Sequence, residues 1–171
     1  MLHPDIAKLL NEQINKEFYS SYLYLAFSNY YADHNLNGFE NWFFVQAQEE
    51  RDHALLLRRY LLNEGDCVTF NAVNAPEPQV FDSFKAPLLT SLEHERSITD
   101  SINRIYTEAS VHQDYRTLQV LNWFVKEQGE EEKNADDLIR KFDLFGADPK
   151  SLYMLNSELA GRVYNPPSLI L

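Results

Sequence analysis

The sequence predicts an all-α fold: a four-helix bundle with one long crossover connection and a short fifth helix at the C-terminus. Four long stretches carry apolar residues at three- and four-residue steps, the period of an amphipathic helix. An aperiodic stretch, 65–82, separates the second from the third and is long enough to cross a bundle lengthwise. Because the chain has 171 residues, 44% of them hydrophobic, we expect one domain, 1–171, with a sizeable core.

The helices are expected at about 5–31, 38–64, 83–110, 115–144 and 149–160. Asn37 is expected to cap the second helix, with Glu40 completing a capping box, and Gly65 to end it. Asp114 should cap the fourth helix and Asp148 the fifth. Because the crossover returns the chain along the bundle, the second and third helices should run parallel.

Each long helix carries a polar break near the middle of its apolar stripe. Glu50 and His53 lie three residues apart and project from one face of a helix. Buried carboxylates repel one another unless cations compensate them, and two divalent metal ions bridged by Glu50 would do so. Carboxylates with a single imidazole suit iron or manganese better than zinc. The breaks in the four stripes are Glu17, then Glu50 with His53, then Glu95, and finally Gln128 with Glu131.

Two other interpretations compete with a dimetal site. Some helices could turn their acids to solvent, but four breaks at matching depth argue against that coincidence. A zinc hydrolase motif would need histidine in place of Glu49. The remaining histidines lie off the stripe and are expected at the surface or at helix ends; they are His3, His34, His94 and His112.

Composition limits the function classes. The formal net charge of −11, with 26 acidic against 15 basic residues, argues against a nucleic-acid or anionic-membrane partner and is compatible with attracting cations. The single cysteine, Cys67, excludes an intramolecular disulfide and a cysteine-based zinc site, and fits a reducing cytoplasm. The N-terminal residues do not resemble a signal peptide, and no stretch is apolar enough for a membrane span, so we expect a cytoplasmic protein.

Several pieces of the sequence have an order and spacing that are specific when taken together. They are Asn11-Glu12-Gln13 with Glu17, Tyr19-Ser20-Ser21 with Tyr24, Ala47-Gln48-Glu49-Glu50 with His53, His94-Glu95, and the run from Trp123 to Lys133. In these pieces the chain resembles the non-haem ferritins of bacteria and archaea, members of the ferritin-like diiron-carboxylate family. The resemblance implies iron storage and detoxification: a ferroxidase oxidises Fe²⁺ to Fe³⁺ with O2 or H2O2 and stores ferric oxyhydroxide inside a homo-oligomeric cage of 24 chains.

By this resemblance, a catalytic diiron centre lies within each chain. Glu50 would bridge the two irons, and Gln128 would lie beside them as a hydrogen-bonding neighbour or weak contact. Tyr24 matches a tyrosine near the centre that donates a hydrogen bond or an electron; a core tyrosine with a satisfied hydroxyl explains it equally well. The implied ligands are Glu17, Glu50 and His53 for the first iron, and Glu50, Glu95 and Glu131 for the second.

The resemblance also implies features outside the diiron centre. Glu130 and Asp137 are candidates for nucleating mineral, or ordinary solvated charges. The fifth helices would meet at four-fold axes of the cage, with Leu152, Tyr153, Leu155 and Leu159 suited to burial there. A third iron site, found in similar bacterial ferritins, would here use Glu49, Glu127, Glu130 and Glu131.

Departures from related families narrow the expectation. Haem-binding bacterioferritins have methionine where this chain has Arg51, and a second Glu-x-x-His on the fourth helix where this chain has Gln128 and Glu131, so no haem is expected. Leu118 and Leu121 replace the acids that line the iron access channel of animal ferritins. The alternatives are a diiron protein that detoxifies peroxide or oxygen without storage, whose relatives usually carry a cysteine-rich module, and a ferritin-like shell with an inactive site.

Overall fold

The computed structural model describes all residues from 1 to 171. It contains five helices and no strands, which confirms the predicted all-α fold. Four helices are long and the fifth is short. Their bounds are α1 (Pro4–Asp33), α2 (Asn37–Asn63), α3 (Ala86–Val111), α4 (Tyr115–Phe145) and α5 (Pro149–Leu159).

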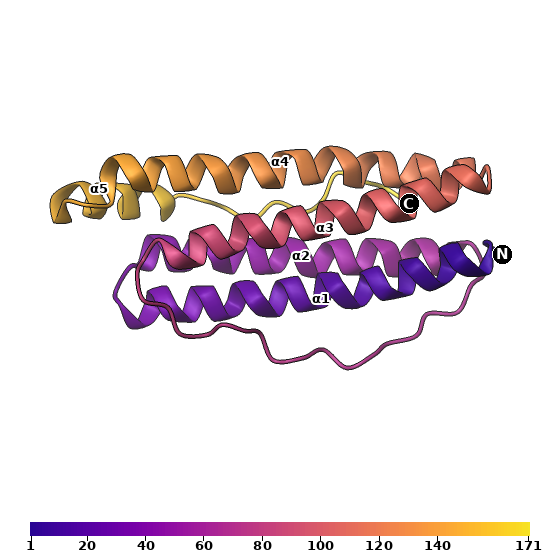
Figure 1. Cartoon of the computed structure of the whole chain (residues 1–171), viewed down its shortest axis with the longest axis horizontal. Coiled ribbons are helices and arrows are strands. Elements are labelled where there is room, and N and C mark those ends of the chain that lie inside the picture. Colours follow the sequence, from indigo (N-terminus) through magenta and orange to yellow (C-terminus); the bar gives the residue numbers. More distant parts are fainter.

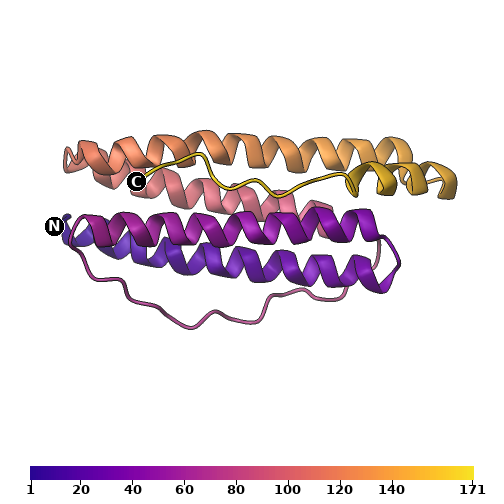
Figure 2. The same ribbon diagram turned by 180° about the vertical axis from the view of Figure 1, so that it is seen from behind.

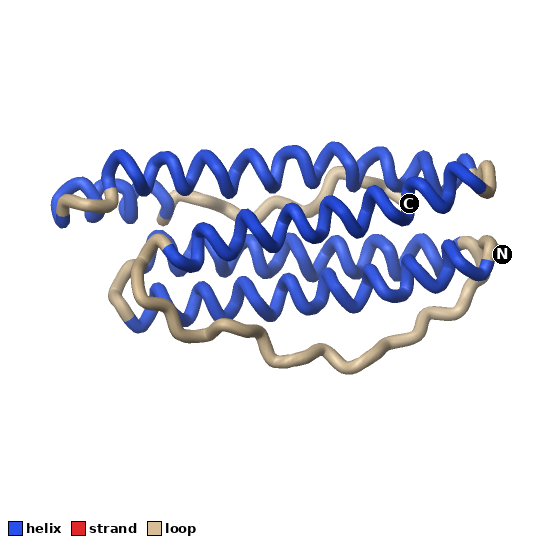
Figure 3. Tube along the Cα trace, in the orientation of Figure 1, coloured by secondary structure: helices blue, strands red, loops and turns tan.

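The long loop between α2 and α3 runs the whole length of the bundle, so α2 and α3 are parallel, as predicted (Figure 1). α1 and α2 form one antiparallel pair and α3 and α4 another, and the loop stands out as the longest non-helical segment (Figure 3). α5 lies at one end of the bundle. From there the C-terminal segment, residues 160–171, returns along the bundle (Figure 2).

Two of the three predicted N-terminal caps are present at the helix ends. Asp114 accepts a hydrogen bond from the backbone N–H of Thr117, and Asp148 one from the N–H of Ser151, so both predicted caps are confirmed. The predicted cap at Asn37 is wrong: Asn37 is the first helical residue, and the capping position, Leu36, makes no side-chain cap hydrogen bond.

A distant side chain takes over this capping role. Oδ1 of Asn156, on α5, accepts hydrogen bonds from the backbone N–H groups of Gly38 at 2.8 Å and Phe39 at 3.3 Å. A Cβ on Gly38 would come within 1.6 Å of the Asn156 carbonyl oxygen, so only glycine permits this close packing of α5 on the start of α2.

The start of α3 also differs from the expectation. The helix begins at Ala86 rather than near Ser83, and Pro87 lies in its first turn. Residues 83–85 form a turn instead. The hydroxyl of Tyr31 donates to the carbonyl of Phe84 at 2.6 Å, which ties this turn to α1.

The core consists of two apolar clusters separated by a polar layer. One cluster is mainly aliphatic and includes Ile6, Leu10, Ile14, Leu57, Leu61, Ile98 and Ile102. The other is mainly aromatic and includes Tyr24, Phe27, Tyr31, Phe39 and Phe43. Along every long helix a buried glutamate, Glu17, Glu50, Glu95 or Glu131, lies between the residues of the two clusters, so the helices are held firmly on both sides of the polar layer. No helix combines the length and the apolar character that crossing a membrane requires.

Candidate metal centre

The polar layer contains a group of three converging side chains. Glu17 comes from α1, and Glu50 and His53 come from α2, and one ligand atom of each lies within 4.8 Å of the others. All three residues are buried. Oε2 of Glu17 has no hydrogen-bond partner, and Nδ1 of His53 has only a long contact, to Oε2 of Glu50 at 3.5 Å. Buried polar atoms are costly to leave unpaired, so this arrangement fits a cation that would bind to them.

A second group shares His53 with the first. It consists of His53, Glu127 and Glu131, whose ligand atoms also lie within 4.8 Å of one another. Glu131 is buried, whereas Glu127 is only partly buried at the side of α4. The two groups together provide hard carboxylate oxygens around one imidazole, a donor set that suits iron or manganese.

Glu95 lies in the same layer but belongs to neither group. The hydroxyl of Tyr24 donates to its Oε1, and Nε2 of Gln128 donates to its Oε2 at 3.1 Å. Ser91 Oγ donates in turn to the Tyr24 hydroxyl at 3.4 Å. Tyr24 is therefore a core tyrosine with a satisfied hydroxyl and at the same time a direct neighbour of a candidate ligand.

Burial and mutual repulsion shift the protonation of these groups. Burial, together with the charge of Glu50, raises the pKa of Glu17 to about 8 and that of Glu131 to about 8. The same causes raise the pKa of Glu95 well above its ordinary value. Burial alone would lower the pKa of His53, but Glu50 and the other nearby carboxylates outweigh it and raise that pKa to about 10. Near neutral pH, Glu17, Glu131 and His53 therefore carry protons, which a bound cation could displace.

Glutamine side chains support two of the acids from one helical turn away. Nε2 of Gln13 donates to Oε1 of Glu17 at 2.8 Å, and Nε2 of Gln46 donates to Oε1 of Glu50 at 2.8 Å. Neither hydrogen bond was predicted, although each glutamine precedes its glutamate by four residues and therefore lies on the same helix face.

A pocket of about 280 Å³ opens next to the second group, between α2, α4 and the C-terminal segment. Glu49 in this pocket accepts a hydrogen bond from Nη2 of Arg162 at 2.5 Å, and the exposed Glu130 pairs with Lys126 at 3.0 Å. Of the four residues predicted for a third iron site, only Glu127 and Glu131 converge. The lining residues are Glu49, His53, Trp123, Glu127, Glu130, Glu131, Asn134, Arg162, Asn165, Pro166, Pro167 and Ser168.

The other histidines divide into two kinds. His3, His34 and His112 lie at helix ends, as predicted. The prediction for His94 is wrong: it is partly buried in the middle of α3, with Nε2 at 2.7 Å from Oγ of Ser20, and burial lowers its pKa. The periodicity of α3 alone could not show this contact, because Ser20 comes from α1.

Comparisons with known proteins agree with this geometry. The family model described as "Ferritin-like domain" matches residues 7–145. The chain belongs to the ferritin family. A bacterial non-heme ferritin from Campylobacter jejuni is 40% identical over 154 residues, which cover 90% of this chain and 92% of that protein. A probable bacterial non-heme ferritin-like protein from Haemophilus influenzae is 36% identical over 159 residues, 93% of this chain and 96% of that protein.

Solved ferritin structures superpose on nearly the whole of this ferritin-family chain. An engineered closed form of the Archaeoglobus fulgidus ferritin has a TM-score of 0.93 at 37% identity and covers 96% of this chain and 100% of that one. A humanized archaeal ferritin has a TM-score of 0.94 at 34% identity and covers 97% of this chain and 100% of that one. Membership of the ferritin family supports iron binding and storage at the level of the family.

Proposed function

We propose that the chain is a ferroxidase that oxidises Fe²⁺ at the buried carboxylate layer and stores the Fe³⁺ product as ferric oxyhydroxide inside a cage of identical chains. The observation that carries this proposal is the convergence of Glu17, Glu50 and His53 in the buried layer, where Oε2 of Glu17 has no hydrogen-bond partner and Nδ1 of His53 has only Oε2 of Glu50 at 3.5 Å. If the layer served only stability, we would expect well-formed hydrogen bonds to these atoms, because a poorly paired buried polar atom costs free energy. A layer built for a cationic substrate leaves them free.

Two Fe²⁺ ions are the substrate of the proposed reaction. Glu17 and His53 would hold one ion, Glu95 and Glu131 the other, and Glu50 would bridge them. Each Fe²⁺ gives up one electron, so O2 takes two electrons and two protons and leaves as H2O2, or H2O2 takes the same and leaves as two water molecules. Carboxylate oxygens favour this direction because hard ligands stabilise Fe³⁺ over Fe²⁺.

Buried acid groups of the protein would supply the protons that the oxidant takes up. Since the pKa of Glu17 and that of Glu131 are raised to about 8, both carboxyls carry protons near neutral pH before iron binds. Binding of Fe²⁺ displaces these protons close to where the oxidant needs them. The hydrogen bonds from Gln13 to Glu17 and from Gln46 to Glu50 each hold one oxygen of the carboxylate. The second oxygen of each carboxylate is then directed at the ion.

Storage requires assembly, and α5 supplies candidate contacts. Leu155 and Leu159 were expected at contacts between chains, but both are buried in the chain's own aromatic cluster, against which Leu152 also packs. Tyr153 and Met154 remain exposed, at 72% and 65%. We therefore assign the apolar part of the α5 contact in a homo-oligomeric cage to Tyr153 and Met154.

The variant Glu50→Ala tests the site. Aerobic Fe²⁺ addition followed by ultraviolet absorbance should show oxidation slowed by at least about 100-fold, because the bridge between the two ions is gone. Glu93→Ala, at an exposed position on the same layer of α3, is the matched control and should oxidise Fe²⁺ like the wild type. Unchanged oxidation in Glu50→Ala would refute the site.

Size-exclusion chromatography with iron analysis tests storage separately. Iron that co-elutes with a particle of many chains, at far more than two ions per chain, supports the cage. Fast oxidation with only about two ions retained per chain indicates detoxification without storage, and no oxidation indicates a shell with an inactive site.

A further inference from the structure

The side chain of Arg162 projects from the C-terminal segment into the pocket beside the second group. Its Nη2 donates to Oε2 of Glu49 at 2.5 Å and to Oε1 of Gln46 at 2.8 Å, and its Nη1 donates to the Trp42 carbonyl at 3.2 Å. Its guanidinium carbon lies 4.3 Å from the centre of the Trp42 ring, a cation–π distance. Only 14% of the Arg162 side chain is exposed. The guanidinium is thus a fixed positive charge.

The backbone around Arg162 is anchored as well. Nδ2 of Asn41 donates to the Arg162 carbonyl at 3.0 Å, and the Arg162 N–H donates to the carbonyl of Leu159 at 3.2 Å. Further along the segment, the hydroxyl of Tyr164 donates to Asp52 on α2, and Nε1 of Trp123 on α4 donates to Oγ of Ser168 at 3.0 Å. The C-terminal segment therefore runs along α2 and α4 (Figure 2), and the guanidinium of Arg162 reaches Glu49.

Four glutamates line this pocket, and His53 and Arg162 are its only basic side chains. A metal ion bound to Glu49 would have to sit beside the guanidinium. A divalent cation and a guanidinium a few ångströms apart in a partly buried pocket repel each other strongly, because little water screens them there. The ion would also have to displace the hydrogen bonds of Arg162 to Glu49.

We infer that Arg162 takes the place of a third metal ion at Glu49, so that the chain binds two ions in the bundle and gains a third only when the guanidinium is removed. This inference rests on the proposed function, because it concerns the occupancy of the same site. Arg162 also positions Glu50: it binds the amide oxygen of Gln46, which directs the amide nitrogen of Gln46 at Oε1 of Glu50.

Anaerobic calorimetric titration with Fe²⁺ tests this occupancy without any oxidation. We expect two ions per chain in the wild type and three in Arg162→Gln, because the neutral amide leaves Glu49 free. Arg162→Lys is the matched control and should stay at two, since it keeps a positive charge at Glu49. The double variant Arg162→Gln with Glu49→Gln should return to two ions.

Two ions in Arg162→Gln, or three in the wild type, would overturn the inference while leaving the ferroxidase proposal intact. No Fe²⁺ bound by the wild type would overturn both. The single variant Glu49→Gln gives an answer even if Arg162→Gln folds poorly. It should keep two ions, because Glu49 is not a ligand while Arg162 holds it; a loss of one ion would contradict the inference.

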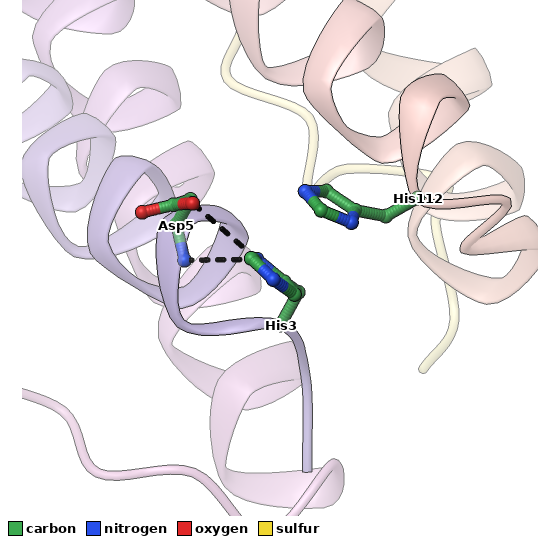
Figure 4. A group of neighbouring side chains, drawn as sticks. All are labelled: His3, Asp5 and His112. Atoms are coloured by element: carbon green, nitrogen blue, oxygen red, sulfur yellow. Dashed lines mark hydrogen bonds and ion pairs between the residues drawn. The ribbon is translucent and has the colours of Figure 1, made fainter.

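A separate cluster of metal-ligand side chains lies on the surface, at the opposite end of the bundle from α5. His3 precedes α1 and His112 follows α3, and their rings are stacked with centroids 3.6 Å apart. One ligand atom each of His3, Asp5 and His112 lies within 4.8 Å of the others (Figure 4). Oε1 of Glu108 lies 2.9 Å from Nε2 of His112, which orients this ring and leaves its Nδ1 free as a ligand.

We propose that His3, Asp5 and His112 form a surface site for a divalent ion that prefers imidazole nitrogen, such as Ni²⁺ or Zn²⁺. Nδ1 of His3 accepts the backbone N–H of Asp5 only at 3.4 Å, so a small turn of the exposed His3 ring would direct a lone pair at an ion bound by Nδ1 of His112. A bound ion would link the start of α1 to the end of α3, two segments distant in the sequence. This site needs no iron chemistry and is independent of the bundle interior.

Ni²⁺ binding in the His53→Ala background isolates the surface site, because His53 is the imidazole that both buried groups share. We expect His3→Gln and His112→Gln each to lose one Ni²⁺ per chain, whereas His34→Gln, the matched control at another exposed helix end, should lose none. The same Ni²⁺ count in all variants would overturn the proposal. A count lowered equally by His34→Gln would also overturn it, because binding would then follow exposed histidine in general.

Discussion

Glu130 and Glu131 are neighbours on α4 and have the same side chain, yet the structure gives them opposite environments. Glu131 is only 6% exposed, faces His53, and has its pKa raised to about 8 by burial and by the charge of Glu50. The side chain of Glu130 is 57% exposed and pairs with Lys126 one turn earlier. One step along the helix turns a side chain by about 100°, so position on the helix decides which acid can bind a substrate cation.

Removing one of the two acids at a time tests this difference most directly. Glu131→Ala takes away a proposed ligand of the second iron, so we expect Fe²⁺ oxidation to slow by at least about 100-fold. Glu130→Ala removes only a solvated ion pair and should change the rate by less than about twofold. Stopped-flow absorbance after aerobic Fe²⁺ addition measures both, and equal losses in the two variants would remove the distinction.

The same contrast shows what the sequence could and could not predict. Periodicity identified the helices and the breaks in their stripes, and Glu17, Glu50, His53 and Glu131 are all buried. Periodicity predicted these buried positions because local spacing decides which face of a helix a residue lies on.

Contacts between segments distant in the sequence were not predictable. Arg162 lies in an aperiodic tail, and only the folded chain brings it to Glu49. The capping of α2 by Asn156 and the contact of His94 with Ser20 were missed for the same reason. Such contacts depend on how helices and tail pack, which no local pattern records.

A smaller effect is expected at Tyr24, which acts through a buried acid rather than as a ligand. Tyr24→Phe removes the hydroxyl that donates to Glu95, so Glu95 loses one of the two donors that orient it. We expect oxidation to slow by about 10-fold, in the range seen when hydrogen-bonding neighbours of metal ligands are removed. Tyr106→Phe, whose hydroxyl bonds only to Asn122, is the matched control and should leave the rate unchanged.

Anaerobic Fe²⁺ titration of Tyr24→Phe separates positioning from folding. Weaker binding of one ion, with the melting temperature nearly unchanged, supports a role in orienting Glu95. If Tyr24→Phe oxidises and binds Fe²⁺ like the wild type, Tyr24 is only a packing residue of the core.

The smallest expected effect is thermal, and it separates buried from exposed acids without any iron. A group whose pKa is raised on folding stabilises the protein below its unfolded pKa and loses that contribution as pH rises through its folded pKa. For Glu17 and Glu131 that window runs from the ordinary 4.5 to about 8, and for His53 from 6.5 to about 10. Glu50, with a lowered pKa, acts in the opposite direction, but only at acidic pH.

The melting temperature of the metal-free protein should therefore fall as pH rises from 5 to 8, by about 5 °C or more. Glu131→Gln removes one of the groups that titrate in this window, so its melting temperature should depend less on pH, whereas Glu130→Gln should follow the wild type. Differential scanning calorimetry at constant ionic strength measures all three. A wild-type melting temperature that stays constant or rises over this range would mean that the buried carboxyls are not protonated, and the layer would then have to hold its negative charge by another means before iron arrives.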